Sequence, residues 1–156
     1  MEYEPGIKSS ISDFINFNNF EIHYYFLEPQ LIFQPGTKFR VRGSFRYTEK
    51  DNQLAENVGQ RAFVRNAGLE AKYNILQRGS INASFNFISI TYDGIVGNTV
   101  EFEMLDGLKN GANYTWAVLF QTKLGKNMQL NLQYNGRKSG ENTAIHTGNV
   151  QVRAFF

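Results

Sequence analysis

Cationic side chains recur at alternate positions in one short segment of the chain, at Lys38, Arg40, Arg42 and Arg46. Alternate positions of a β-strand lie on one face, so these side chains would share a surface. Such a surface could guide anions or bind the phosphate groups of lipopolysaccharide. A structural role is favoured, because charges on the polar face of a narrow barrel need oppositely charged partners to offset their desolvation.

The expected partners lie on the polar faces of other predicted strands. Sixteen Lys and Arg residues nearly balance 14 Asp and Glu residues, which is consistent with mutual pairing. The predicted network of interior charges comprises Lys38, Arg40, Arg42, Arg46, Glu70, Lys72, Glu101, Glu103 and Arg153. The net charge of +2 is too small to indicate a nucleic-acid partner.

Residues that could support catalysis or bind a metal are scarce. The chain has two histidines, His23 and His146, and no HExxH or GxSxG motif accompanies them. The absence of cysteine excludes disulfides and thiolate metal sites. We therefore expect no enzymatic activity, no metal and no cofactor, and we interpret both histidines as ordinary polar positions.

The elements that would position the charges are strands, because apolar and polar residues alternate with a period of two along most of the chain. A polar loop is expected over Glu49–Arg61, and a change of parity at Ile88 and Ile90 indicates a bulge or the end of a strand. Leu54–Val64 and Glu101–Leu108 could each form at most a turn or two of helix. The alternating segments, about eight in number, are 20–26, 39–47, 69–75, 81–87, 100–104, 114–120, 128–134 and 150–156.

The carboxy-terminal segment is the most informative of these. Val150, Val152, Ala154 and Phe156 share one face, and the chain ends on an aromatic residue. A lipid-facing apolar surface and a polar interior are typical of outer-membrane barrels. No run of about 18 apolar residues indicates a transmembrane helix. The sequence thus predicts an all-β, antiparallel, up-and-down transmembrane β-barrel of about eight strands.

The expected domain organisation is simple. Residues 1–19 form a lead-in segment or the start of the first strand, and residues 20–156 form the outer-membrane barrel. The start of the chain lacks the features of a signal peptide, so we expect a mature or truncated form. Both termini of such barrels are periplasmic. This places the turn 125–127 in the periplasm, together with Glu49–Arg61, although periplasmic turns are normally short.

Three segments together resemble a known group of proteins: Gly107–Trp116, Tyr134–Asn142 and His146–Phe156. They look like the carboxy-terminal barrel region of large, poorly characterised outer-membrane proteins of the Bacteroidota. The last four alternate apolar positions, Val150 to Phe156, also resemble the insertion signal read by the barrel-assembly machinery. That signal places a glycine where this chain has Gln151.

The resemblance implies a location and an architecture. The chain would be a membrane anchor, or a structural subunit of a larger surface or envelope assembly, with its interior closed by ion pairs. Its partners would be outer-membrane lipid, the barrel-assembly machinery during insertion and other envelope proteins.

Two alternatives stay open. A soluble, lipocalin-like barrel that binds a small apolar ligand would turn the apolar faces inward and the cations outward. A barrel enzyme acting on lipids would need a nucleophile and a base, which the sequence does not identify.

Overall fold

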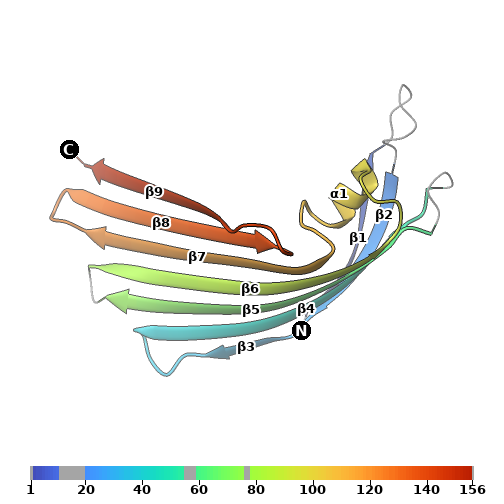
Figure 1. The fold of residues 1–156 in the computed structure, drawn as a ribbon. Helices are drawn as coiled ribbons and strands as arrows, with labels where there is room; N and C mark the ends of the chain where they lie inside the picture. The colour runs from blue at the N-terminus through green and yellow to red at the C-terminus, as the bar shows by residue number, and fades with distance from the viewer. Residues whose placement is uncertain (1, 11–19, 55–58, 76–77, 156) are drawn as a thin grey trace. The chain divides into compact units, whose positions relative to one another are not determined.

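The computed structural model describes residues 2–10, 20–54, 59–75 and 78–155, and strands dominate it (Figure 1). In these described residues nine strands form one sheet, and a single short helix, α1 (Thr99–Met104), lies between the sixth strand and the seventh. The strands are β1 Glu2–Ser10, β2 Phe20–Glu28, β3 Gln30–Phe33, β4 Phe39–Asn52, β5 Arg61–Ile75, β6 Gly79–Asp93, β7 Gly111–Lys123, β8 Met128–Ser139 and β9 Ile145–Ala154.

The order across the sheet is β1-β2-β4-β5-β6-β7-β8-β9, and β3 pairs with β4 beside this path. β2 and β3 pair with successive parts of β4 on either side of Pro29. Proline has no N–H to donate, so it interrupts the ladder at this point. The predicted all-β, antiparallel, up-and-down fold is confirmed, with eight strands along the main path of the sheet. The strand pairs of the described residues do not join β1 to β9, so barrel closure stays a prediction.

The amino-terminal residues contribute a full strand. Residues 2–10 form β1, which pairs with β2 along its length, from Glu2 opposite Glu28 to Ser10 opposite Phe20. Antiparallel strands alternate in direction, so the connections 53–60, 94–110 and 140–144 belong to one end of the sheet. The prediction that the Glu49–Arg61 loop shares an end with the turn 125–127 is therefore wrong. That prediction did not include β1, and one additional strand at the start moves each later connection to the opposite end of the sheet. The loop is also shorter than expected, because β4 extends to Asn52.

The chain divides into two compact units. Unit 1 comprises Met1–Pro29, Phe45–Asn66 and Ile88–Asn113, and unit 2 comprises Gln30–Ser44, Ala67–Phe87 and Tyr114–Phe156. In unit 1, α1 and the residue after it pack on one face of the sheet. The buried apolar core of this unit consists of Phe20, Ile22, Ala62, Ile90, Tyr92, Val100, Met104 and Leu105.

The segment 100–104 is a helix, so the prediction that it is a strand is wrong. Asn98 caps the helix, because its Oδ1 accepts a hydrogen bond from the backbone N–H of Glu101 at 2.7 Å. Val100 and Met104 are fully buried, whereas Phe102 between them is 63% exposed. That spacing fits the i, i+4 periodicity of a helix and not the alternation of a strand.

The face covered by α1 explains two further differences from the prediction. β6 does not end at Ile88 or Ile90 but continues to Asp93, and both residues keep the parity of the polar residues earlier in the strand. This face becomes apolar because it joins the core of unit 1. On β2, the apolar residues Phe20 and Ile22 likewise point into the core, so the expectation that this parity faces lipid is wrong there.

Unit 2 has the opposite distribution. Among its described residues, no apolar side chain is buried, although large apolar residues occur on every strand. Leu69, Phe85, Tyr134, Val150 and Val152 are 42–69% exposed. The apolar face of this unit therefore lacks a cover from the described part of the chain.

Candidate functional site

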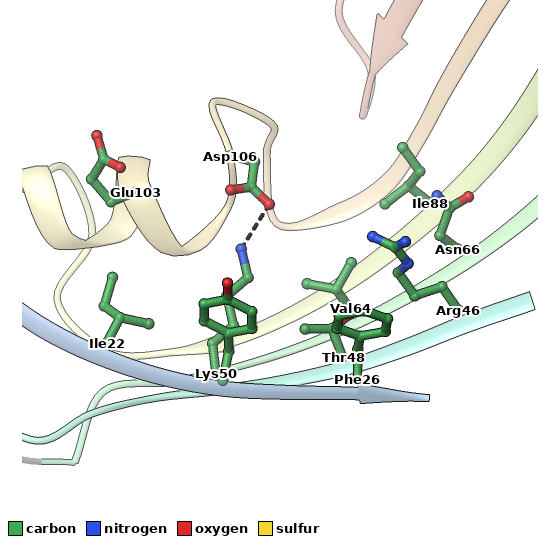
Figure 2. A pocket seen from close by; sticks show the side chains of 11 residues that line it. Ile22, Phe26, Arg46, Thr48, Lys50, Val64, Asn66, Ile88, Glu103 and Asp106 are labelled. Carbon is green, nitrogen blue, oxygen red and sulfur yellow. Dashed lines mark hydrogen bonds and ion pairs between the residues drawn. The ribbon is translucent and has the colours of Figure 1, made fainter. Parts of the chain in front are cut away.

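A cavity of about 360 Å³ lies in unit 1, between the sheet and the segment that follows α1 (Figure 2). Its apolar floor is built by side chains of one parity on three strands. Ile22 and Phe26 come from β2, Val64 from β5 and Ile88 from β6. Alternation along each strand brings these apolar groups to the same face, where they line the floor of the cavity. The volume lies in the range of small-molecule sites.

Lys50 contributes a nearly buried charge to this cavity. Its side chain is 11% exposed, and its Nζ lies 2.7 Å from Oδ2 of Asp106, in the turn after α1 (Figure 2). Asp106 is 65% exposed and adopts a positive φ of 52°, which is uncommon for a residue other than glycine. The ion pair thus joins β4 to the turn after α1.

Arg46 is the second cation of the cavity. Its guanidinium forms an ion pair with Glu28 and lies 4.5 Å from the centre of the Phe26 ring, within the range of a cation–π contact. Glu28 is only 11% exposed at its side chain. The β2–β4 register places Phe26 opposite Thr48, and its continuation places Glu28 opposite Arg46. The pair is therefore a direct cross-strand contact.

Backbone bonds fix the neighbours of these residues on β5. The bonds at the two ends of the β4–β5 ladder are Asn52 N to Gln60 O at 3.0 Å and Asn74 N to Lys38 O at 2.7 Å. Both fit one unbroken register, in which Arg46 is opposite Asn66. Asn66 lines the cavity, and its Oδ1 is buried without a hydrogen-bond partner among the described residues.

The predicted charge network is present in part. Arg40 Nη2 and Arg42 Nη2 lie 3.4 Å and 2.5 Å from the two carboxylate oxygens of Glu70, all within unit 2. Arg42 and Glu70 are directly opposite in the same β4–β5 register. Arg46 does not join this group, because it pairs with Glu28. In the part of the chain that the structure describes, no ion pair links Lys38, Lys72 or Arg153 to an acid.

The sequence predicted that Glu101 and Glu103 lie on the polar face of a strand. This prediction is wrong, because both residues belong to α1. Glu101 Oε2 accepts a hydrogen bond from the backbone N–H of Gly97 at 2.5 Å, so it helps to cap the helix. Glu103 lines the cavity of unit 1. The sequence does contain a signal for this helix, since Asn98 precedes Glu101 at capping-box spacing.

Sequence reasoning missed Glu28, Lys50 and Asp106. Lys50 falls within the predicted Glu49–Arg61 loop, and Asp106 falls within Glu101–Leu108, for which the sequence predicts at most a turn or two of helix. Lys50 does, however, continue the even parity of Arg42 and Arg46 into the cavity. Extending that alternation by two steps would have found it.

The predicted insertion signal lies on β9, where Val152 pairs with Leu130, Val150 with Leu132 and Ala154 with Met128. Val150 and Val152 are 69% and 54% exposed. Phe156, the last residue of the signal, lies outside the described residues. Its predicted outward orientation therefore stays a prediction.

An aromatic cluster occupies the apolar face of unit 2. The Trp116 and His146 ring centres are 5.7 Å apart, and Tyr134 stacks on His146 at 6.0 Å. A hydrogen bond of 2.8 Å joins the Tyr134 hydroxyl to His146 Nδ1. The Trp116 ring covers Gly136, where a Cβ atom would lie 2.1 Å from its Cε2. Amphipathic aromatic residues of this kind are typical of membrane interfaces.

Few other described side chains are arranged for chemistry. His23 Nε2 contacts Glu21 Oε1 at 2.8 Å, as an ordinary polar pair. The described residues contain no group of three or more His, Cys, Asp or Glu that could hold a metal ion. No helix among them is long and apolar enough to cross a membrane.

No protein-family model, no curated protein and no solved structure matches the chain.

Proposed function

We propose that this chain is an outer-membrane β-barrel that acts as a membrane anchor, or as a structural subunit of a larger surface or envelope assembly. In this proposal β1 pairs with β9 to close the sheet, and the chain is not an enzyme. Its partners are outer-membrane lipid, the barrel-assembly machinery during insertion and other envelope proteins. The resemblance of its carboxy-terminal segments to outer-membrane proteins of the Bacteroidota belongs to the same proposal.

The exposed apolar face of unit 2 carries the proposal. Leu69, Phe85 and Val118 are exposed on three strands, while polar residues such as Glu70 and Asn86 on the opposite face make ion pairs or hydrogen bonds. Water would make this arrangement costly, since exposed apolar patches beyond a few hundred Å² are rare in soluble monomers. A lipid bilayer removes that cost, because it covers the apolar face and leaves the polar face inside.

The soluble, lipocalin-like alternative needs the reverse arrangement in unit 2. A carrier of apolar ligands turns its apolar parity inward, so residues such as Val150 and Val152 would be covered. Unit 1 does bury apolar residues of β2 and β6, but it does so beneath α1. On β5 and β6 the apolar Leu69 and Phe85 are exposed, whereas the polar Glu70 and Asn86 beside them are half-buried, and this contrast favours the membrane proposal.

Ion pairs are expected to close the interior. The interior of an eight-stranded barrel is just wide enough for side chains to fill it or for one small ligand, and it is too narrow for an aqueous channel. Long charged side chains from adjacent strands already pair in this structure, as Arg42 does with Glu70 and Arg46 with Glu28. We therefore expect an anchor without a diffusion channel.

The membrane location and the closed interior are tested by folding the full chain in detergent and then recording its conductance in planar bilayers. The expected result is a species that stays monodisperse only with detergent and that gives no stable, porin-sized conductance. A chain that is monodisperse without detergent would refute the membrane location. Stable conductance would instead refute the closed interior.

A further inference from the structure

The cavity of unit 1 has no role in the proposed anchor, and its chemistry is specific. It combines an apolar floor with two cations, two carboxylates and an amide (Figure 2). An anchor needs only a filled interior at this position. A cavity of about 360 Å³ instead leaves apolar contacts unmade, which lowers stability unless something occupies the space.

The charges of the cavity argue against an anionic ligand. Arg46 already pairs with Glu28, and Lys50 already pairs with Asp106. Glu103 adds a further carboxylate to the wall. A carboxylate or phosphate would have to displace one of these pairs and would lie near Glu103. The cavity thus offers no unpaired cation to an anion.

The charges also argue against a cation at the amide end. Asn66 is opposite Arg46 in the β4–β5 register, so a positive group beside Asn66 would be repelled by the guanidinium. A neutral group meets neither obstacle.

Asn66 determines which neutral group fits. Its buried Oδ1 lacks a partner in the described part of the chain, and leaving such an atom unsatisfied is costly. A hydroxyl group can donate to this oxygen. If the Asn66 amide is flipped, so that its nitrogen takes the place of Oδ1, the hydroxyl group can accept a hydrogen bond from that nitrogen instead. Val64 and Ile88 then provide apolar contacts for the body that carries the hydroxyl.

We propose that the cavity binds a small neutral molecule that carries hydroxyl groups on an apolar ring or chain. One hydroxyl hydrogen-bonds to Asn66, and the apolar body lies on Ile22, Val64 and Ile88. The Lys50–Asp106 pair stays intact and forms part of the wall.

Three probes of similar size test the choice of head group: trans-1,4-cyclohexanediol, cyclohexanecarboxylate and cyclohexylamine. Each is titrated into the full chain with ¹³C-labelled Ile and Val methyl groups, and chemical shifts are followed by NMR. The expected result is saturable shifts of the Ile22, Val64 and Ile88 methyls with the diol alone. The measurement needs only the folded chain, in micelles or in plain buffer, so its outcome is independent of the membrane proposal.

Substitutions then locate the hydroxyl. Asn66→Ala is expected to weaken diol binding about fivefold, the loss of one hydrogen bond. Asn135→Ala, on β8 in unit 2, provides a control that should bind the diol normally. Saturable shifts with the carboxylate or the amine, or none with the diol, would overturn the proposal. Equal diol affinity in the Asn66→Ala and Asn135→Ala variants would do so as well.

Discussion

The only tryptophan of the chain lies on a glycine of the neighbouring strand. Trp116 covers Gly136, and this close approach lets its ring reach His146 on β9. Tyr134 stacks on the same imidazole. A side chain at position 136 would occupy the place of the indole, so glycine is required by contact and not by backbone conformation. Three adjacent strands, β7, β8 and β9, are thereby joined on the apolar face of unit 2.

Substituting this glycine should release the indole. In Gly136→Ala the new Cβ would lie 2.1 Å from Trp116 Cε2, so the ring must move and lose its contact with His146. We expect a shift of the tryptophan emission maximum and a loss of about 1–2 kcal/mol in unfolding free energy, as for other overpacked sites. Fluorescence during a urea titration measures both.

Gly148→Ala is the matched control on β9. Its Cβ would meet only the Gln133 carbonyl oxygen, at an ordinary 3.9 Å. The emission maximum should stay unchanged and the stability should not fall. An unchanged spectrum in Gly136→Ala would show that Trp116 does not lie on this glycine.

At the scale of the element, α1 determines the chemistry of the sheet face beneath it. The even positions of β6 are polar at Ser84 and Asn86 and become apolar at Ile88 and Ile90, where they enter the core of unit 1. One strand therefore carries two different patterns on the same face. A rule that fixes one polar and one apolar face per strand cannot predict this change, because the change depends on a segment distant in the sequence.

The helix itself can be tested by its periodicity. Met104→Ala should lower the unfolding free energy by about 2–4 kcal/mol, because this side chain is fully buried. Phe102→Ala should cost less than about 1 kcal/mol, because the ring is 63% exposed. Denaturant unfolding of the two variants gives the comparison. Equal losses would favour a strand, in which both residues share one face.

Neighbouring residues on β8 allow a similar test of the lipid-facing parity. Leu132 pairs with the exposed Val150, whereas Gln133 belongs to the polar parity. In lipid vesicles, Leu132→Arg should destabilise the fold by about 2–4 kcal/mol if it lies near mid-membrane, because a charge there is exposed to hydrocarbon. Gln133→Arg should cost far less. Similar costs in a folding titration would contradict a bilayer on the apolar face.

Much of the sheet was predictable because most of its strands follow one pattern. Alternation located the segments around Phe39–Tyr47, Leu69–Ile75 and Met128–Tyr134. Several apolar residues of these segments, such as Phe39, Leu69 and Met128, are exposed, as expected for a lipid-facing surface. β1 escaped detection, since Pro5 and Gly6 are depleted from strand interiors and read as a lead-in segment.

The candidate site was less predictable than the sheet. The sequence placed Arg42 and Glu70 on polar faces, and the structure pairs them. The partners Glu28 for Arg46 and Asp106 for Lys50 depend on strand register and on the path of the chain after α1. Neither can be obtained from local alternation, because register is set by turns and packing. The cavity likewise depends on strand register and on the path of the chain after α1, so local alternation does not predict it.

At the scale of the whole molecule, the central claim is that lipid covers the apolar face of unit 2. The sheet order assigns the connections that follow β4, β6 and β8 to one end of the sheet, and the connections 29–38 and 124–127 to the other. Trp116 lies beside Gly136, near the end of β8 that precedes the 140–144 connection.

Quenching of Trp116 by brominated lipids tests this claim most directly, because the chain has no other tryptophan and needs no substitution. The native chain is folded into vesicles whose acyl chains carry bromine either near the headgroup or near the terminal methyl. We predict strong quenching by bromine near the headgroup, weaker quenching by bromine near the bilayer centre and little quenching by aqueous acrylamide. Efficient acrylamide quenching with no effect of either brominated lipid would contradict a membrane-embedded barrel.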